Sequence, residues 1–352
     1  MKLYQVPEVI ARVEGRCARL TLNRPQALHA LTEPMCAAIT AALLAWREDP
    51  LVDLVLIDHA GERGFCAGGD IRAMASHGAN NPAAGAEFFL SEYRMNELLQ
   101  RYPKPTCAIM DGVTMGGGVG LSAYCAYRVA TERTVFAMPE TGIGLFPDIG
   151  AGWFLSRLPG EIGTWLALTG ARLKAPDCLY LNLCTHHVPS SRVAALKDKL
   201  VAGPWEARRI LARFHDDPGL APLSGKQAAL DGVFAFDTVE EIIAALEAGS
   251  SWAKEQAAIL ATKSPASMKV ALRELRGSPE RPNFADEMGL EYRLACRMIQ
   301  RHDFQEGVRA VVVDKDNAPK WSPARLEDVT DQMLDALFAP FGDQAEFSPI
   351  DG

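Results

Sequence analysis

The order of hydrophobic and polar positions divides the chain into short strands and amphipathic helices. Strands are expected where apolar and polar residues alternate, or where a short run is wholly apolar, at residues 9–13, 17–22, 54–57, 106–110, 128–131 and 135–137. Helices are expected where apolar residues recur at helical spacing, at residues 32–46, 84–101, 149–158, 161–168, 193–201 and 239–248. Gly15 separates the first two strands and predicts a hairpin.

Strand and helix patterns alternate as far as about residue 150, which favours an α/β architecture over a helical bundle. A glycine-rich turn at 61–69 leads into a polar loop, and helical patterns dominate after residue 150. No further strand is expected after residue 190 until the β-branched run at 310–313. We therefore predict a core over residues 1–190 that carries the active site, a mainly helical region over 191–352 that completes it, and a frayed tail from residue 341.

Composition narrows the classes of function. The chain has 352 residues, 48% hydrophobic and 23% charged, as in an ordinary globular protein, with no run of roughly 20 apolar residues that could span a membrane. A net charge of −8 argues against a general nucleic-acid binder. The eight cysteines include no CxxC pair, and no histidine stands at metal-ligand spacing. These features, with an N-terminus unlike a signal peptide, predict reduced core cysteines and a cytoplasmic protein.

Two glycine clusters follow two of the apolar strands, at 65–70 and 115–120, and the second opens an apolar helix that extends to about residue 124. Glycine lets the backbone approach a ligand closely, and a carbonyl that becomes an anion needs preorganised N–H donors. Tight packing of strand on helix is the alternative explanation for either cluster alone. A P-loop, a GxGxxG spacing and a GxSxG nucleophile elbow are all missing, and Ser122 is better explained as a helix residue than as a nucleophile.

Two carboxylates stand in the apolar segment that follows these clusters. Glu140 comes just after the strand at 135–137, and Asp148 lies eight residues further on. An apolar environment raises the pKa of a carboxylic acid, which suits acid–base or nucleophilic catalysis. Asp148 alone is equally compatible with a cap on the helix expected from residue 149.

These residues resemble the crotonase (enoyl-CoA hydratase/isomerase) superfamily. The segment 22–31 is similar to its N-terminal CoA-contacting loop, although His29 stands where asparagine is common, and the glycine clusters are similar to its paired oxyanion loops. The resemblance implies an α/β fold, a crotonase-like spiral of ββα units with a helical C-terminal region. It also implies that the N–H groups of Gly69 and Gly117 are the oxyanion donors. CoA contacts are implied at Ala27, Leu28, Ala67 and Ile71.

Within this superfamily the chain is most similar to the 3-hydroxyisobutyryl-CoA hydrolases. Crotonase hydratases carry two glutamates, and their positions correspond here to Gly120 and Glu140, so that the first glutamate is missing. Similarity to the hydrolase branch continues through the segments 166–174, 263–267, 288–294, 302–310 and 314–321. It implies that Glu140 and Asp148 form the catalytic pair and that Glu92 faces the acyl group. Without the resemblance, Glu92 would be taken for a solvated charge on its helix.

The resemblance implies hydrolysis of a short branched 3-hydroxyacyl-CoA thioester, with the 3-hydroxyisobutyryl-CoA of valine catabolism as the expected substrate. The substrate brings CoA, and neither a metal nor another cofactor is expected. A hydratase or isomerase on the same fold is the nearest alternative, and a non-catalytic CoA-binding protein is the alternative of another class. A homo-oligomer stays open, because crotonases often form trimers while the longer C-terminal region could cover that surface.

Overall fold

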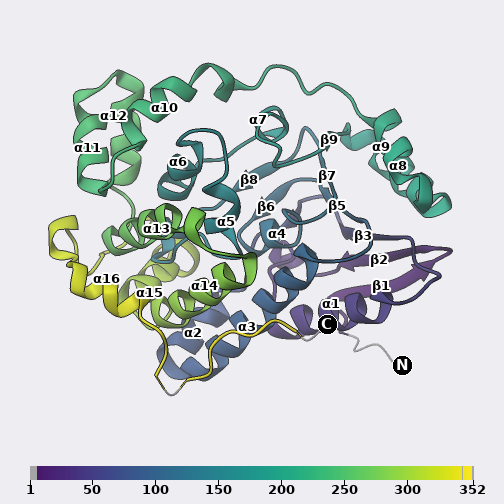
Figure 1. Cartoon of the computed structure of the whole chain (residues 1–352), viewed down its shortest axis with the longest axis horizontal. Coiled ribbons are helices and arrows are strands. Elements are labelled where there is room, and N and C mark those ends of the chain that lie inside the picture. The colour runs from purple at the N-terminus through teal and green to yellow at the C-terminus, as the bar shows by residue number, and fades with distance from the viewer. Residues whose placement is uncertain (1–5, 343, 351–352) are drawn as a thin grey trace.

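The computed structural model describes residues 6–342 and 344–350 (Figure 1). One sheet has the order β1-β2-β3-β5-β7-β9 and the other has the order β4-β6-β8. The strands are β1 Val9–Glu14, β2 Cys17–Leu22, β3 Leu54–His59, β4 Gly64–Cys66, β5 Thr106–Met110, β6 Val113–Met115, β7 Tyr127–Ala130, β8 Val135–Ala137 and β9 His186–His187. Among the strands of the described residues, β1 and β2 are the one pair that runs antiparallel, through the predicted hairpin at Gly15, whose φ is 62°.

The chain moves between the two sheets in a regular order. After the hairpin, β3, β5 and β7 enter the large sheet, and each is followed by a short strand, β4, β6 or β8, in the small sheet. Helices then return the chain to the next strand of the large sheet. This succession is the predicted spiral of ββα units, and it places the ends of β4 and β6 next to each other.

Helices cover both faces of the large sheet. Alternate residues of β3, such as Val55 and Ile57, belong to a large core that also contains side chains of α1 (Glu33–Arg47) and α3 (Pro82–Gln100). The residues between them, such as Leu54 and Leu56, pack on the opposite face against α8 (Ser190–Ala202) and α9 (Ala207–Phe214). Burial on both faces explains why residues 54–57 of β3 are apolar at every position.

The remaining helices follow the spiral and then build the C-terminal region (Figure 1). They are α2 Ile71–Asn80, α4 Gly117–Gly120, α5 Ala151–Leu155, α6 Ile162–Thr169, α7 Ala175–Tyr180, α10 Gln227–Phe234, α11 Val239–Ala248, α12 Ser251–Leu260, α13 Pro265–Gly277, α14 Phe284–Met298, α15 His302–Val308 and α16 Asp331–Phe338. α14 packs on α3, so that the C-terminal region shares the core of the spiral. The division into a core over residues 1–190 that carries the site and a helical region over 191–352 that completes it stays a prediction.

Several local expectations were wrong. The polar loop expected after the first glycine cluster is α2, whose first turn is capped by Asp70, which accepts a hydrogen bond from the Ala73 N–H. The strand expected at 310–313 lies in a π-helix, Arg309–Val313, that continues α15. Val311 and Val313 are exposed there, and no strand lies beside them within the described residues, so the β-branched run has nothing to pair with.

The C-terminal tail also differs from the expectation of fraying. Arg94 of α3 donates hydrogen bonds to Ser348, and Arg101, which directly follows α3, donates one to the backbone oxygen of Ile350. Glu346 accepts a 2.9 Å hydrogen bond from Arg293 of α14. The described part of the tail is therefore held along α3 and α14 (Figure 1), and residues 343, 351 and 352 lie outside the described residues.

Candidate active site

The small sheet brings the two glycine clusters together. β4 and β6 pair in parallel, and each ends in one of the clusters. A Cβ atom built on Gly68 would lie 3.7 Å from the Gly117 nitrogen and 3.4 Å from the Met115 oxygen, so the two turns are in contact. Gly116 has a φ of 46° and a ψ of −124°, a conformation that side chains disfavour, which explains the need for glycine there.

The backbone N–H groups of the two predicted donors, Gly69 and Gly117, are not used by the hydrogen bonds of the neighbouring backbone. Gly117 is the first residue of α4, so its N–H has no partner within the helix. Around Gly69, the Leu31 N–H donates to Gly68 (2.8 Å) and the Asp70 N–H donates to Leu31 (2.8 Å). These bonds use the neighbours of Gly69 and not its own N–H. The geometry is compatible with an oxyanion hole at this junction.

Three carboxyl groups lie around the second glycine turn. Glu92 comes from α3, Glu140 opens the 3-10 helix Glu140–Ile143, and Asp148 precedes α5; their exposed fractions are 2%, 5% and 5%. A Cβ atom on Gly117 would overlap the Glu92 Oε1 atom, and one on Gly116 would lie 3.1 Å from the Glu140 Oε1 atom. The structure thus brings together the predicted residues, and the interpretation of Glu92 as a solvated charge is wrong.

Asp148 does not cap a helix. Its Oδ2 atom accepts a 2.7 Å hydrogen bond from the Tyr93 hydroxyl, and the cap position of α5 belongs to Gly150. The helix expected from residue 149 begins at Ala151 because Ile149 and Gly150 both have positive φ.

Burial sets the protonation of this group of acids. It raises the pKa of the Asp148 carboxyl to about 6, although the hydrogen bond from Tyr93 acts in the opposite direction. Burial, and then the charge of Asp148, also raise the pKa of Glu92 and of Glu140 well above the usual range. Glu140 and Glu92 each have one buried oxygen without a hydrogen-bond donor among the described residues. The Asp148 carboxyl can therefore take up and release a proton near pH 6, and Glu92 and Glu140 hold their protons to higher pH than exposed carboxyl groups do.

We expect Asp148→Asn to flatten the dependence of stability on pH. Because the pKa of about 6 in the folded chain exceeds the ordinary aspartate pKa of 3.8, the native state retains a proton that the unfolded chain has released. The resulting stabilisation is complete below about pH 4 and is lost as the pH rises through 6, a loss of about 3 kcal/mol. Urea unfolding at pH 4 and pH 7 measures it, and the difference between the two pH values should shrink by about this amount in the variant. An unchanged difference would contradict the assignment.

The four predicted CoA contacts lie at the rim of this site. Ala27 ends a 3-10 helix, Pro25–Ala27, and Leu28 accepts a 3.0 Å hydrogen bond from the Ala67 N–H. Ile71 begins α2 directly after the first glycine cluster. All four residues are half-buried, whereas the carboxyl groups are buried. His29, the departure from the family pattern, is buried beneath the loop, where its ring bonds to the Arg24 N–H and the Ala60 oxygen.

Three further residues around the site were missed by sequence reasoning. Tyr93 binds Asp148, and Asn96 lies one helical turn after Glu92 and against Gly120. Burial of the ammonium group lowers the pKa of Lys263, and the charge of Glu140 raises it by less. The i, i+4 spacing of Glu92 and Asn96 was an available signal, because it places two polar side chains on one helix face. Nothing local marked Tyr93 or Lys263.

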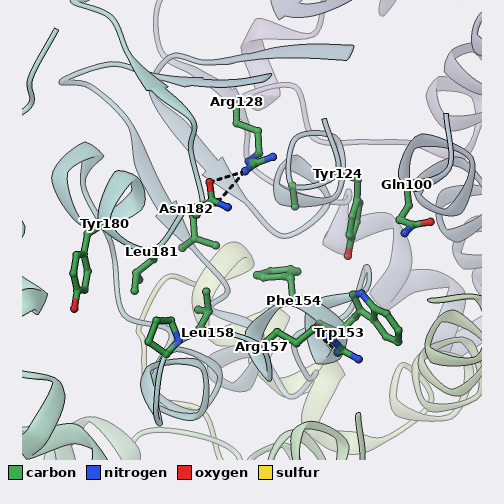
Figure 2. A pocket seen from close by; sticks show the side chains of 13 residues that line it. Gln100, Tyr124, Arg128, Trp153, Phe154, Arg157, Leu158, Tyr180, Leu181 and Asn182 are labelled. Carbon is green, nitrogen blue, oxygen red and sulfur yellow. Dashed lines mark hydrogen bonds between the residues drawn. The ribbon is translucent and has the colours of Figure 1, made fainter. Parts of the chain in front are cut away.

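A pocket of about 500 Å³ lies outside this group of residues (Figure 2). Its lining includes Trp153 and Phe154 of α5, Tyr124, and Arg128, which donates hydrogen bonds to Asn182. None of the residues predicted for catalysis or for CoA lines it. The pocket is therefore separate from the candidate site, although Tyr124 contributes to both regions through its bonds to Ile149 and Gly150.

Other sequence expectations concern the rest of the chain. All eight cysteines are free and buried, and burial raises the pKa of every thiol. The Ser122 hydroxyl donates to the Gly118 carbonyl oxygen (2.9 Å), as suits a structural residue. Among the described helices, none is both long enough and apolar enough to cross a membrane.

Comparison with known proteins identifies several similar chains. The enoyl-CoA hydratase/isomerase family model matches residues 17–338. The mitochondrial 3-hydroxyisobutyryl-CoA hydrolase of Danio rerio is 43% identical over 342 residues, which cover 94% of this chain and 89% of that protein. Its counterpart from Homo sapiens is 41% identical over 345 residues, with coverage of 95% and 89%. The cytoplasmic location expected for this chain stays a prediction.

Two solved structures are similar over nearly the whole chain. A carnitinyl-CoA dehydratase from Mycobacterium thermoresistibile has a TM-score of 0.92 at 39% identity, covering 97% of this chain and 98% of its own. An enoyl-CoA hydratase from Rhodobacter sphaeroides has a TM-score of 0.89 at 39% identity, with coverage of 97% and 99%. The architecture is therefore shared with enzymes named for different reactions on CoA thioesters, and the reaction must be argued from the site.

Proposed function

Because this chain belongs to the enoyl-CoA hydratase/isomerase family, we propose that it is an acyl-CoA thioester hydrolase that converts 3-hydroxyisobutyryl-CoA to 3-hydroxyisobutyrate and CoA, a step of valine catabolism. The curated relatives at 41–43% identity are named for this hydrolysis. The observation that carries the proposal is the contact between two glycine turns beside three buried carboxyl groups, Glu92, Glu140 and Asp148.

The thioester carbonyl oxygen would accept hydrogen bonds from the N–H groups of Gly69 and Gly117. Negative charge grows on this oxygen when the carbonyl carbon is attacked, and donors fixed in the backbone stabilise it without reorganisation. Gly117 is also the first residue of α4, so the positive end of the helix dipole lies at this donor, although the helix is short. The half-buried Ala27, Leu28, Ala67 and Ile71 would contact CoA at the entrance.

Glu140 would start the reaction in one of two ways. It either attacks the carbonyl carbon to form an anhydride that water then cleaves, or it takes a proton from a water molecule that attacks directly. In both cases the tetrahedral intermediate expels the CoA thiolate. Asp148 would orient the water or deliver a proton to the leaving sulfur, and Glu92 would face the acyl group. The proposed reaction uses these side chains and backbone donors, and neither a metal nor a redox cofactor takes part.

The surroundings of Gly120 favour hydrolysis over hydration. A crotonase hydratase has its first glutamate at this position. Here, a Cβ atom at Gly120 would lie 2.8 Å from the Asn96 Oδ1 atom, and Asn96 is fully buried. The space that the hydratase's first glutamate would need is therefore filled by the Asn96 amide. A site with one of the two hydratase glutamates is poorly suited to placing water across a double bond.

Separate measurements of CoA release and of enoyl absorbance test the proposal. With 3-hydroxyisobutyryl-CoA we expect release of CoA in step with formation of the free acid, and with an enoyl-CoA we expect little loss of the double bond. Hydration without CoA release would replace the hydrolase by a hydratase. No turnover of any short 3-hydroxyacyl-CoA, together with tight CoA binding, would favour a non-catalytic CoA-binding protein.

A further inference from the structure

The turn that follows Asp148 has a conformation that its sequence disfavours. The Ala151 N–H donates to the Asp148 carbonyl oxygen (3.0 Å), and the two residues between them, Ile149 and Gly150, have φ values of 60° and 80°. A turn with two positive φ values is commonly built from Asn-Gly or Gly-Gly. A β-branched residue such as Ile149 is strained there, so other contacts must hold the turn.

Two side chains from outside the turn form hydrogen bonds with its backbone. The Tyr124 hydroxyl lies 3.0 Å from both the Ile149 and the Gly150 carbonyl oxygens. The carboxylate of Glu291, in α14, accepts the Gly150 N–H at 2.6 Å and the Gly152 N–H at 3.3 Å. Tyr93 completes the arrangement by binding the Asp148 side chain itself. The backbone and the carboxylate of Asp148 are thereby fixed from two directions.

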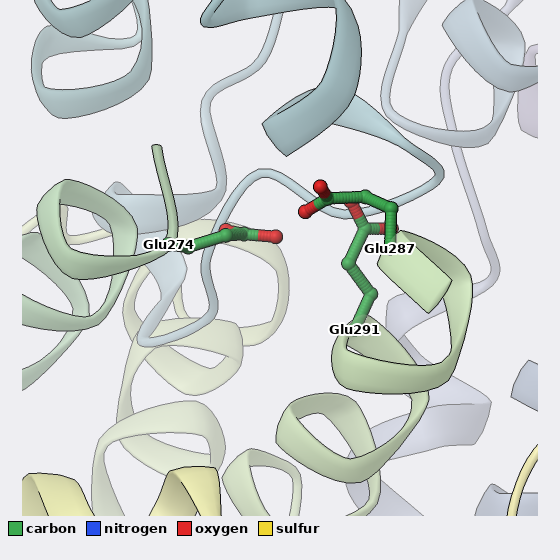
Figure 3. Close-up of side chains that lie close together, drawn as sticks. All are labelled: Glu274, Glu287 and Glu291. Atoms are coloured by element: carbon green, nitrogen blue, oxygen red, sulfur yellow. The ribbon is translucent and has the colours of Figure 1, made fainter. Parts of the chain in front are cut away.

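Glu291 is one of three fully buried glutamates, with Glu274 and Glu287, each of which has a carboxyl oxygen within 4.8 Å of those of the other two (Figure 3). The oxygens of Glu287 bind Arg281 (2.8 Å) and Ser278 (2.6 Å), and those of Glu291 bind the turn. Both carboxylates are thus already occupied by protein donors, which leaves no set of free oxygens for a cation.

Glu274 differs from its two neighbours. Neither of its oxygens has a hydrogen-bond donor among the described residues, and burial followed by the charges of Glu291 and Glu287 raises its pKa well above the usual range. The pKa of Glu291 is also raised by burial, but the N–H donor of Gly150 favours its anionic form. The proton of the cluster therefore belongs on Glu274, and Glu291 stays available as an acceptor for the turn.

We infer that Glu291 is a positioning residue for Asp148, acting through the turn 148–151. The inference rests on the proposed function only in that Asp148 takes part in the reaction. It assigns to α14, in the C-terminal region, a share in the chemistry of a site whose donors and acids come from residues 69–148.

Kinetics of CoA release from 3-hydroxyisobutyryl-CoA by the full chain test this assignment. We expect Glu291→Ala to lower kcat about 10–100-fold, with KM changed less than about threefold, as when a hydrogen-bond partner that orients a functional group is removed. Glu291→Gln keeps one acceptor oxygen for the Gly150 N–H and should restore most of kcat. Glu274→Gln is the matched control, because it is equally buried in the same cluster but does not bind the turn, and its kcat should equal that of the wild type.

A double-mutant cycle shows whether the effect passes through Asp148. If it does, Glu291→Ala should cause little further loss in an Asp148→Asn background. Should Glu291→Ala fail to fold, Tyr124→Phe removes the other contact with the turn and should lower kcat in the same way. Wild-type kcat in folded Glu291→Ala and in Tyr124→Phe, or an equal loss with and without Asp148, would overturn the inference. Failure of the proposed function is a different result, because the wild type would then release no CoA.

Discussion

Glu140→Gln is expected to lower kcat for CoA release from 3-hydroxyisobutyryl-CoA by about a thousandfold or more. The amide fills the same space as the carboxyl group, but it can neither attack a carbonyl carbon nor accept a proton from water at neutral pH. KM should change little, because the predicted CoA contacts at Ala27, Leu28, Ala67 and Ile71 stay in place. Steady-state CoA release at pH 7 gives both constants.

The variant should fold normally, since it removes a buried acid whose pKa is already raised by burial and by the charge of Asp148. A melting temperature equal to or above that of the wild type is the control for this point. Activity within tenfold of the wild type in a folded Glu140→Gln protein would remove Glu140 from the reaction, whether as nucleophile or as base. Another group would then have to attack the thioester carbonyl carbon or activate the water that attacks it.

Gly117→Ala is expected to lower kcat by about a hundredfold to a thousandfold, the usual effect of losing one oxyanion donor. The backbone of Gly117 does not have a positive φ, so alanine is compatible with the conformation itself. The added Cβ atom would, however, overlap the Glu92 Oε1 atom and lie 3.0 Å from the Leu31 Cδ1 atom. Relief of this overlap must displace either Glu92 or the turn that carries the N–H donor.

Gly289→Ala provides the matched control for this substitution. Gly289 lies within α14, and a Cβ atom built on it meets nothing within 4 Å. Alanine there should leave kcat unchanged and should raise stability by about 0.5–1 kcal/mol, because glycine is unfavourable inside a helix. If Gly117→Ala turned over substrate as fast as Gly289→Ala, the N–H of Gly117 would not be an oxyanion donor.

The parts of the fold that could be predicted are those in which one short segment carries the whole signal. The apolar run at 54–57 predicted β3 because a strand buried on both faces needs apolar side chains at every position. The run at 310–313 shows the limit of the same reasoning. Its β-branched residues favour a strand, but a strand needs a neighbour, and this segment has none among the described strands.

The residues of the candidate site also fall into those that the sequence reveals and those that it does not. Glycine-rich turns after strands, and acids in an apolar segment, can be recognised from the sequence, and the structure brings Gly69, Gly117, Glu140 and Asp148 together. The residues that act on these groups could not be found locally. Glu291 reaches the turn after Asp148 only because α14 packs on α3, and its own neighbours in the sequence describe an ordinary amphipathic helix.

The eight buried cysteines decide how the proposed activity is best followed. A thiol-specific chromogenic reagent reacts with thiolates, and thiols that are buried and have raised pKa values present few of them at neutral pH. The folded chain should therefore give almost no background signal, so that the colour developed during turnover reports CoA alone. The same reagent would react with all eight thiols once a variant unfolds. A single assay can therefore distinguish a folded but inactive variant from an unfolded one.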